Sequence, residues 1–501
     1  MCQTECDGCN ATMLRKDLIE HRLHCNEVTV QCPFHFAGCT TRPRCIDLGS
    51  HTLEAKFHHM MLLEDITVQA TTIDPLIALL RVGGGDAVNE VVARALRLLA
   101  RDNHVNQLPI TLEAAIIPLI ALLSGDRCDA VKRESTMALT YIANVHTNRI
   151  TIAQCGAITP LVAMLSRDTC DDVKEVAVDA LRTLAGHASN QDMIAQAGGI
   201  GPLVALLNGS SGDSVKHLAL RALGDLGAAH SSNTISITEA GAIAPILAML
   251  SGDWSTCSKT EAARVIDILA ENYDKNKVDI PLAGAIPLLI PLLSGDGDYD
   301  DDYVKRTAAR TLRTLAANAD NHVAIAKAGG IGPLVALLGE NGDDSVIESG
   351  AKALCRIALG DNDMQVIIAD TGAIEPLVAL LQRGKCDRVK RAAVCALCAV
   401  AENTSNKVGI ARAGGIGALV ALLHKREWYK VTKAAAEALH ILASNHDIRA
   451  TIIQSGAIPM LGSILVRGGS CYRDTVLQAI RVLTDERRCS SRIAVKRGRG
   501  E

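Results

Sequence analysis

The phrase AGGIGPLVALL occupies residues 197–207 and recurs unchanged at 328–338, and a near copy, AGGIGALVALL, occupies 413–423. Its first glycine returns every 42 to 45 residues. These glycines are Gly156, Gly198, Gly241, Gly284, Gly329, Gly372, Gly414 and Gly456. Two earlier units, beginning near Ile73 and Ile116, keep the PLIALL part of the phrase without the glycine. A period of this length indicates a stack of about ten helical repeats.

Each unit has the same internal order. The phrase at 200–207 predicts a short apolar helix, and the polar loop NGSSGDS at 208–214 follows it. A second short helix then merges into a longer one, typified by AVDALRTLA at 177–185, whose apolar residues recur at helical spacing and form one buried stripe. The recurring glycine is expected directly after the long helix, where it suits a left-handed helix cap that turns the chain toward the next unit.

The composition favours the same architecture. The chain has 501 residues, too many for one ordinary core, and 48% are hydrophobic although only 2% are aromatic. The interior is therefore built from Leu, Ile, Val and Ala, and neighbouring units must stack because no single unit can bury its own apolar face. The net charge of −4 gives no general attraction to nucleic acid or anionic membrane.

The repeat resembles the armadillo repeat in its length of about 42 residues and its ALxxLA…N…I…GaIxxLVxLL signature. The resemblance covers residues 66–486, and the phrasing is similar to the long arrays of vacuolar-protein-8-like proteins. It implies an all-α, right-handed superhelix of three-helix repeats with a concave groove. HEAT repeats are the alternative, but the glycine-centred turn favours armadillo.

The opening of the chain has a different character, because seven of its seventeen cysteines fall within the first 45 residues. Two cysteine–histidine sets follow one another, each with an eleven-residue gap between its second cysteine and its histidine. Closely spaced thiolates followed by His and Cys at i and i+4 on a helix predict a closed tetrahedral zinc site, and we expect two structural zinc ions. The first set is Cys6, Cys9, His21 and Cys25, and the second is Cys32, Cys39 and His51, completed by His58 or His59.

Together the two sets resemble the TRAF-type zinc finger, with CPFHFAGC at 32–39 and HTLEAKFHHMMLL at 51–63. The spacing of that family selects His59 as the eighth ligand, and His58 is the alternate. Cys2 competes with Cys6 in the first set. A RING domain is excluded because only one CxxC pair precedes His51. Residues 1–63 carry six basic and seven acidic side chains, which favours protein contact over phosphate contact.

The long helix of peptide-binding armadillo proteins carries a ladder of asparagines before the LA pair, and none of the ten matching positions here is Asn. These positions are Leu98, Tyr141, Thr183, Asp225, Ile268, Thr314, Arg356, Ala399, Ile441 and Val482. A receptor for nuclear-localisation signals is therefore disfavoured. One turn earlier, four consecutive units present a cation. We expect Arg221, Arg264, Arg310 and Lys352 to form a basic stripe that receives an acidic or phosphorylated partner segment. The alternative is that they only keep the groove hydrated.

No Ser–His–Asp set, phosphate loop or paired-carboxylate pattern occurs, so we expect neither an enzyme nor a small-molecule substrate.

No apolar run reaches the ~18–20 residues that a membrane span needs. The absence of a signal peptide and the His–Cys interleaving favour the cytoplasm, with the nucleus as the alternative. A basic tail at 487–501 is expected to be disordered.

These features predict a non-catalytic adaptor that docks partner proteins in its groove and carries a zinc module over residues 1–63. The alternative is a substrate-recruiting subunit of a ubiquitin ligase, since TRAF-type fingers accompany ligase domains. An RNA-binding solenoid is disfavoured by charge.

Overall fold

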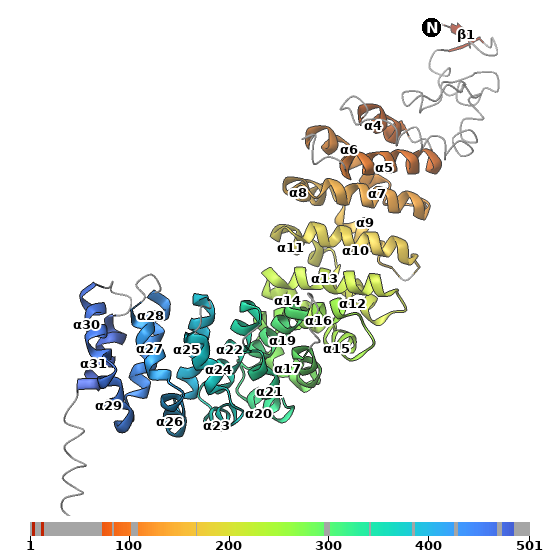
Figure 1. Ribbon diagram of the computed structural model, residues 1–501. Helices are drawn as coiled ribbons and strands as arrows, with labels where there is room; N and C mark the ends of the chain where they lie inside the picture. The colour runs from red at the N-terminus through yellow and green to blue at the C-terminus, as the bar shows by residue number, and fades with distance from the viewer. Residues whose placement is uncertain are drawn as a thin grey trace, which may run out of the picture. The chain divides into compact units, whose positions relative to one another are not determined.

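The structure is a computed structural model (Figure 1). It describes residues 3–5, 12–14, 73–82, 85–101, 109–166, 168–294, 301–339, 342–382, 386–424, 429–467 and 473–484. The chain forms two compact units, Met1–Ala242 (unit 1) and Ile243–Glu501 (unit 2).

Unit 1 begins with a small hairpin. Strand β1 (Gln3–Glu5) pairs in antiparallel orientation with β2 (Thr12–Leu14), so that Gln3 lies opposite Leu14 and Glu5 opposite Thr12. Apart from this hairpin, the regular elements in the described part of the chain are helical.

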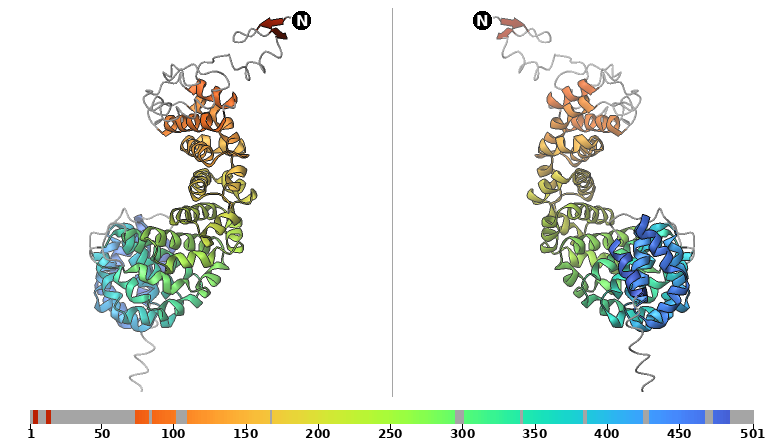
Figure 2. Two further views of the ribbon diagram at one scale, coloured as in Figure 1. Left: turned by 90° about the vertical axis from the view of Figure 1, so that its right-hand side faces the viewer. Right: turned by 90° about the vertical axis from the view of Figure 1, so that its left-hand side faces the viewer.

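The helices of unit 1 repeat a pattern of short, long and short elements. The four long helices α5, α7, α10 and α13 pack side by side in one row, as the views of Figures 1 and 2 show. The helices are α4 (Ile73–Val82), α5 (Gly85–Arg101), α6 (Pro109–Ala121), α7 (Asp129–Ile142), α8 (His146–Gln154), α9 (Ile158–Ala163), α10 (Asp171–Ala185), α11 (Ala188–Gln196), α12 (Ile200–Asn208), α13 (Asp213–Ala229) and α14 (Ser231–Glu239).

Unit 2 continues the pattern with a second row of six long helices, α16, α19, α22, α25, α28 and α31, each packed on the next. The long helices are α16 (Thr256–Asn272), α19 (Asp301–Leu315), α22 (Asp344–Ala358), α25 (Asp387–Val400), α28 (Tyr429–Leu442) and α31 (Arg473–Thr484). The shorter ones are α15 (Ile243–Ser251), α17 (Asn276–Leu282), α18 (Ala285–Leu289), η4 (Ile290–Leu293), α20 (Asp320–Lys327), α21 (Ile331–Ala336), α23 (Asn362–Asp370), α24 (Ile374–Gln382), α26 (Thr404–Arg412), α27 (Gly415–Leu423), α29 (His446–Gln454) and α30 (Ala457–Arg467).

The predicted order of elements within a repeat is confirmed with one correction. The short apolar helix appears as α12, and the short helix after the polar loop is continuous with the long one, as in α10. The sequence reading placed the recurring glycine directly after the long helix. In the structure a further short helix, α11 in this repeat, lies between the two. All eight glycines have positive φ, from 74° at Gly198 to 95° at Gly284, so their predicted left-handed conformation is confirmed.

A buried asparagine joins the long helix to the short helix that follows it. The last carbonyl groups of a helix lack partners within it, and the Nδ2 group of Asn190 donates to one of them, Leu184 O, at 3.0 Å. The same amide donates to Arg149 O of the preceding repeat at 2.9 Å. Asn321 and Asn406 make the same pair of bonds in unit 2. The asparagine of the repeat signature therefore fixes both the turn within a repeat and its contact with the previous one.

The core of each unit consists of aliphatic side chains, as the composition predicts. Leu181, Leu184 and Ile194 in unit 1 are at most 1% exposed, and Leu312, Leu354 and Leu397 fill equivalent places in unit 2. Among the described helices, none is by itself both long and apolar enough to cross a bilayer. Five pairs of short helices meet that requirement only jointly, and each pair is sharply bent at its break.

Candidate basic binding surface

A cavity of about 650 Å³ opens on the row of long helices in unit 2. It is lined by residues of α16, α19, α22 and α25, four helices that pack in sequence. We call it the stripe pocket, because three of the four predicted stripe residues, Arg264, Arg310 and Lys352, lie in its wall. Arg221 lies in α13 of unit 1. The structure therefore brings three of the four together, and their role in partner binding stays a prediction.

The stripe cations are paired with carboxylates of their own helices or of the neighbouring one. Arg264 Nη2 lies 2.5 Å from Glu261, and Lys352 Nζ lies 2.6 Å from Glu348. Arg310 reaches back from α19 to Asp267 of α16 at 2.6 Å. Much of the positive charge that the sequence pattern indicates is thus balanced locally.

Asp267 is buried at the base of this arrangement. Its side chain is 2% exposed and accepts a hydrogen bond of 2.6 Å from the Thr314 hydroxyl in addition to the ion pair with Arg310. Burial raises the pKa of Asp267, and the Thr314 hydrogen bond and the Arg310 charge counteract the effect. Arg310 is consequently a structural partner of a buried acid as well as a pocket residue.

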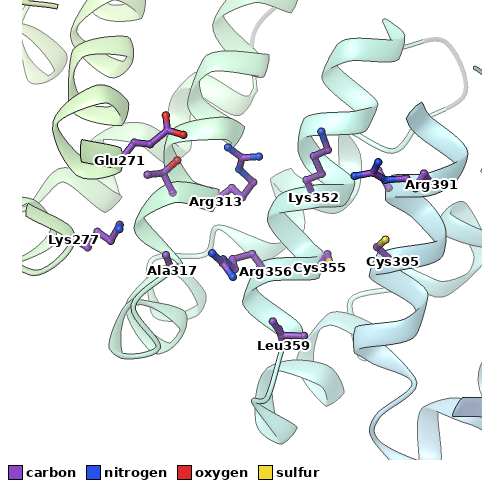
Figure 3. A pocket seen from close by; sticks show the side chains of 12 residues that line it. Glu271, Lys277, Arg313, Ala317, Lys352, Cys355, Arg356, Leu359, Arg391 and Cys395 are labelled. Atoms are coloured by element: carbon purple, nitrogen blue, oxygen red, sulfur yellow. The ribbon is translucent and has the colours of Figure 1, made fainter. Parts of the chain in front are cut away.

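A second cavity of about 410 Å³ adjoins the first and shares Glu271, Arg313 and Lys352 with it. We call it the arginine pocket. Arg313 of α19, Arg356 of α22 and Arg391 of α25 enter it from three successive long helices (Figure 3). The figure shows the Arg391 guanidinium turned toward Lys352. Within the described residues, no carboxylate forms an ion pair with Arg313, Arg356 or Arg391.

The walls of the arginine pocket are partly apolar. Leu359, 51% exposed, lines one end, and Ala317, Ala392, Cys355 and Cys395 contribute further apolar surface. Burial raises the pKa of the Cys355 thiol to about 12 and also raises that of Cys395. Both thiols therefore stay protonated at neutral pH and do not supply a negative charge to the surrounding guanidinium groups.

The two pockets together form the basic surface of unit 2. It carries nine basic side chains and three acidic ones, although the whole chain has a net charge of −4. The basic residues are Arg264, Lys277, Arg306, Arg310, Arg313, Lys352, Arg356, Arg388 and Arg391, and the acidic ones are Asp267, Glu271 and Glu348. Sequence reasoning noted Arg356 only as a missing ladder asparagine. It missed Arg313 and Arg391. Together with Arg356 they line one cavity from three different positions in the repeat, so no single repeat position identifies them.

Unit 1 has a cavity of similar size on its own long helices, with a different charge. Its basic residues are Arg133 and Arg182, and its acidic residues are Asp172, Glu175 and Asp179. Arg182 is paired with Asp179 at 2.8 Å. This cavity of unit 1 therefore lacks the excess of cations found in the stripe pocket and the arginine pocket.

The predicted zinc ligands Cys6, Cys9, His21, Cys25, Cys32, Cys39, His51 and His59, with the alternates His58 and Cys2, lie outside the described residues. In the described ranges, no group of three or more His, Cys, Asp or Glu side chains is arranged to hold a metal ion. The predicted domain limits at 63, 66 and 486 and the count of ten units also stay predictions.

Comparison with known proteins agrees with the helical repeat. The family model for the armadillo/beta-catenin-like repeat matches residues 145–186 and 187–228. The crystal structure of an engineered protein from the Northeast Structural Genomics Consortium is 27% identical over 83% of this chain and 99% of its own, with a TM-score of 0.75. A second engineered protein from that consortium is 30% identical over 49% of this chain and 99% of its own, with a TM-score of 0.46. No curated protein matches the chain.

The fold, the family match and the first engineered protein define the class as helical repeat proteins built from stacked units. More specifically, this chain is an armadillo-like repeat protein. Arrays of this class generally serve as protein-binding scaffolds, because stacked repeats present an extended surface, and their members are typically non-catalytic.

Proposed function

We propose that the protein is a non-catalytic scaffold that holds a partner protein by an acidic or phosphorylated segment on the basic surface of unit 2. The observation that carries this proposal is the ratio of nine basic to three acidic side chains on that surface. Complementary charge accelerates association and selects against partners of the wrong sign. Because arginines predominate, planar carboxylates and phosphates can be held by two parallel hydrogen bonds.

The N-terminal region is proposed to be a TRAF-type zinc module with two structural ions. The antiparallel pairing of β1 and β2 supports this, because the short connection between them contains Cys6 and Cys9. Thiolate and imidazole are the donors that tetrahedral zinc prefers. The similarity of the repeat to vacuolar-protein-8-like arrays and a cytoplasmic location belong to the same proposal.

Charge reversal tests the scaffold function. Arg310→Glu is unsuitable because it would place a carboxylate against buried Asp267. We therefore choose Arg306→Glu with Arg388→Glu, since both residues line the stripe pocket and Arg388 is 73% exposed. The readout is affinity purification with mass spectrometry, and we expect partners recovered with the unaltered chain to be lost.

The matched control is Lys327→Glu with Arg412→Glu, which changes the net charge equally on the short helices α20 and α26. It should leave recovery unchanged. Equal recovery with both double variants would refute the proposal. A ubiquitin-conjugating enzyme or cullin component among the partners would favour the ligase-subunit alternative.

A further inference from the structure

The nine cations of the basic surface are not equivalent. Those that line the stripe pocket alone, and Lys352, which lines both pockets, have partners in the structure. Arg264, Arg310 and Lys352 pair with carboxylates, Arg388 lies 3.8 Å from Glu348, and Arg306 lies 5.0 Å from the ring centroid of Tyr303. A carboxylate brought by a partner would have to compete with these contacts.

The arginine pocket has few carboxylates to pair with its cations. Its five cations, Lys277, Arg313, Lys352, Arg356 and Arg391, face a single acidic side chain, Glu271. Lys277 is paired with Asp274 and Lys352 with Glu348. The three arginines, in the part of the chain that the structure describes, have no carboxylate in ion-pairing contact. The uncompensated charge of the surface is therefore concentrated at the guanidinium groups of this pocket.

We infer that the arginine pocket is a phosphate subsite, which takes the phosphorylated serine or threonine of the segment that docks on the basic surface. This inference rests on the proposed scaffold function and specifies its ligand. Three guanidinium groups from three successive helices match a group with about −1.5 to −2 charge and three acceptor oxygens better than they match a single carboxylate.

The apolar part of the wall fits the same ligand. Leu359 and Ala317 offer surface for the Cβ methylene of phosphoserine or the methyl group of phosphothreonine, and for a flanking apolar residue. Cys355 and Cys395 contribute neutral thiols, so the pocket remains positively charged at neutral pH. The cavity of about 410 Å³ is large enough for a phosphorylated side chain.

The test uses the full chain and three short fluorescein-labelled peptides of alternating Gly and Asp. The peptides carry phosphoserine, Asp or Ser at the centre and are otherwise identical, and binding is measured by fluorescence polarisation. We expect the phosphoserine peptide to bind roughly tenfold or more tightly than the Asp peptide. Arg356→Gln with Arg391→Gln should remove that difference. Both residues are exposed on helices and Gln preserves helix propensity, so the fold should be retained.

The matched control is Arg388→Gln in the stripe pocket, which should weaken the phosphoserine and Asp peptides by similar factors. If the Asp and phosphoserine peptides bind equally and the arginine-pocket variant weakens both alike, the phosphate subsite is refuted while the scaffold proposal survives. If neither acidic peptide binds at all, the scaffold proposal fails first. Binding of inositol hexakisphosphate that depends on Arg356 and Arg391, without binding of the phosphoserine peptide, would refute a peptide subsite in favour of a small polyphosphate site.

Discussion

At the scale of single residues, one position of each repeat is restricted by backbone conformation. Gly198 has φ of +74° and no neighbour near the place where a Cβ atom would lie. Gly201, only three residues later, also has open space around it but sits within helix α12 with ordinary backbone angles. Gly198 and Gly201, two of the three glycines in the AGGIGPLVALL phrase, therefore occupy positions with opposite conformational requirements.

Alanine substitution at each position distinguishes the two conformational roles. Gly198→Ala should lower the free energy of unfolding by roughly 1–2 kcal/mol, because an L side chain strains the left-handed conformation. Gly201→Ala should raise it by about 0.5–1 kcal/mol, because alanine restricts the unfolded chain and favours the helix. Urea denaturation of both variants measures the difference. A shift of the same sign in both would contradict the conformational explanation.

At the scale of elements, an aspartate in the first turn of one long helix binds the start of the next. Asp171 accepts a hydrogen bond of 2.8 Å from the Gly212 amide, and Asp86 accepts one of 2.9 Å from the Cys128 amide. Asp344 makes a longer version, 3.4 Å, with the Cys386 amide. These bonds span 41 or 42 residues and fix the spacing of neighbouring repeats. The backbone hydrogen bond lowers the pKa of Asp86 and of Asp171.

The hydrogen bond between Asp171 and the Gly212 amide predicts that the stability of the fold depends on pH. Because the pKa of Asp171 in the folded state is lowered from 3.8, its stabilisation is complete above about pH 3.8 and is lost as the pH falls through the lower, folded value. Asp171→Asn should therefore lower the free energy of unfolding by about 0.5 kcal/mol at pH 7, a small value because the site is solvent-screened. At strongly acidic pH the substitution should change the free energy of unfolding very little. Urea denaturation of unit 1 at a series of pH values measures this. Asp172→Asn, also in the first turn of α10, is the control. The difference in free energy of unfolding between this variant and the unaltered chain should not disappear at acidic pH in the same way.

At the scale of the whole molecule, partner binding is proposed for unit 2 and zinc binding for residues 1–63. The rows of long helices in both units carry a cavity. Among the three cavities described above, the two of unit 2 have an excess of cations and the one of unit 1 does not. An acidic segment should therefore select unit 2. The N-terminal residues 1–63 are proposed to be stable through metal ligation, because so short a segment with few aromatic residues can bury little apolar surface.

Removal of zinc should consequently affect one part of the chain. We expect about two zinc ions per chain by elemental analysis, since structural zinc of this kind contributes roughly 10–16 kcal/mol. Chelation should make residues 1–63 sensitive to protease while the helical circular dichroism signal stays nearly constant. A chain purified without zinc, or helical units that melt on chelation, would overturn the proposed module.

The repeat could be predicted from the sequence, because its period, its glycine positions and its aliphatic composition are local properties that follow from helix and turn chemistry. The left-handed glycines and the continuous long helix were predictable for this reason, whereas the extra short helix α11, with its weakly periodic polar sequence, was not. The stripe residues Arg264, Arg310 and Lys352 could be read from one register position and do share a pocket.

Which cations lack an ion-pair partner could not be predicted from the sequence and follows from the packing of the helices. Arg310 is paired with Asp267, 43 residues earlier, whereas Arg313, Arg356 and Arg391 line one cavity from different register positions on three helices. Ion pairing and convergence depend on how neighbouring helices are packed and on the directions of long side chains. A repeat pattern specifies that the helices stack, but the distance between two charges on different helices is set by the packed core between them.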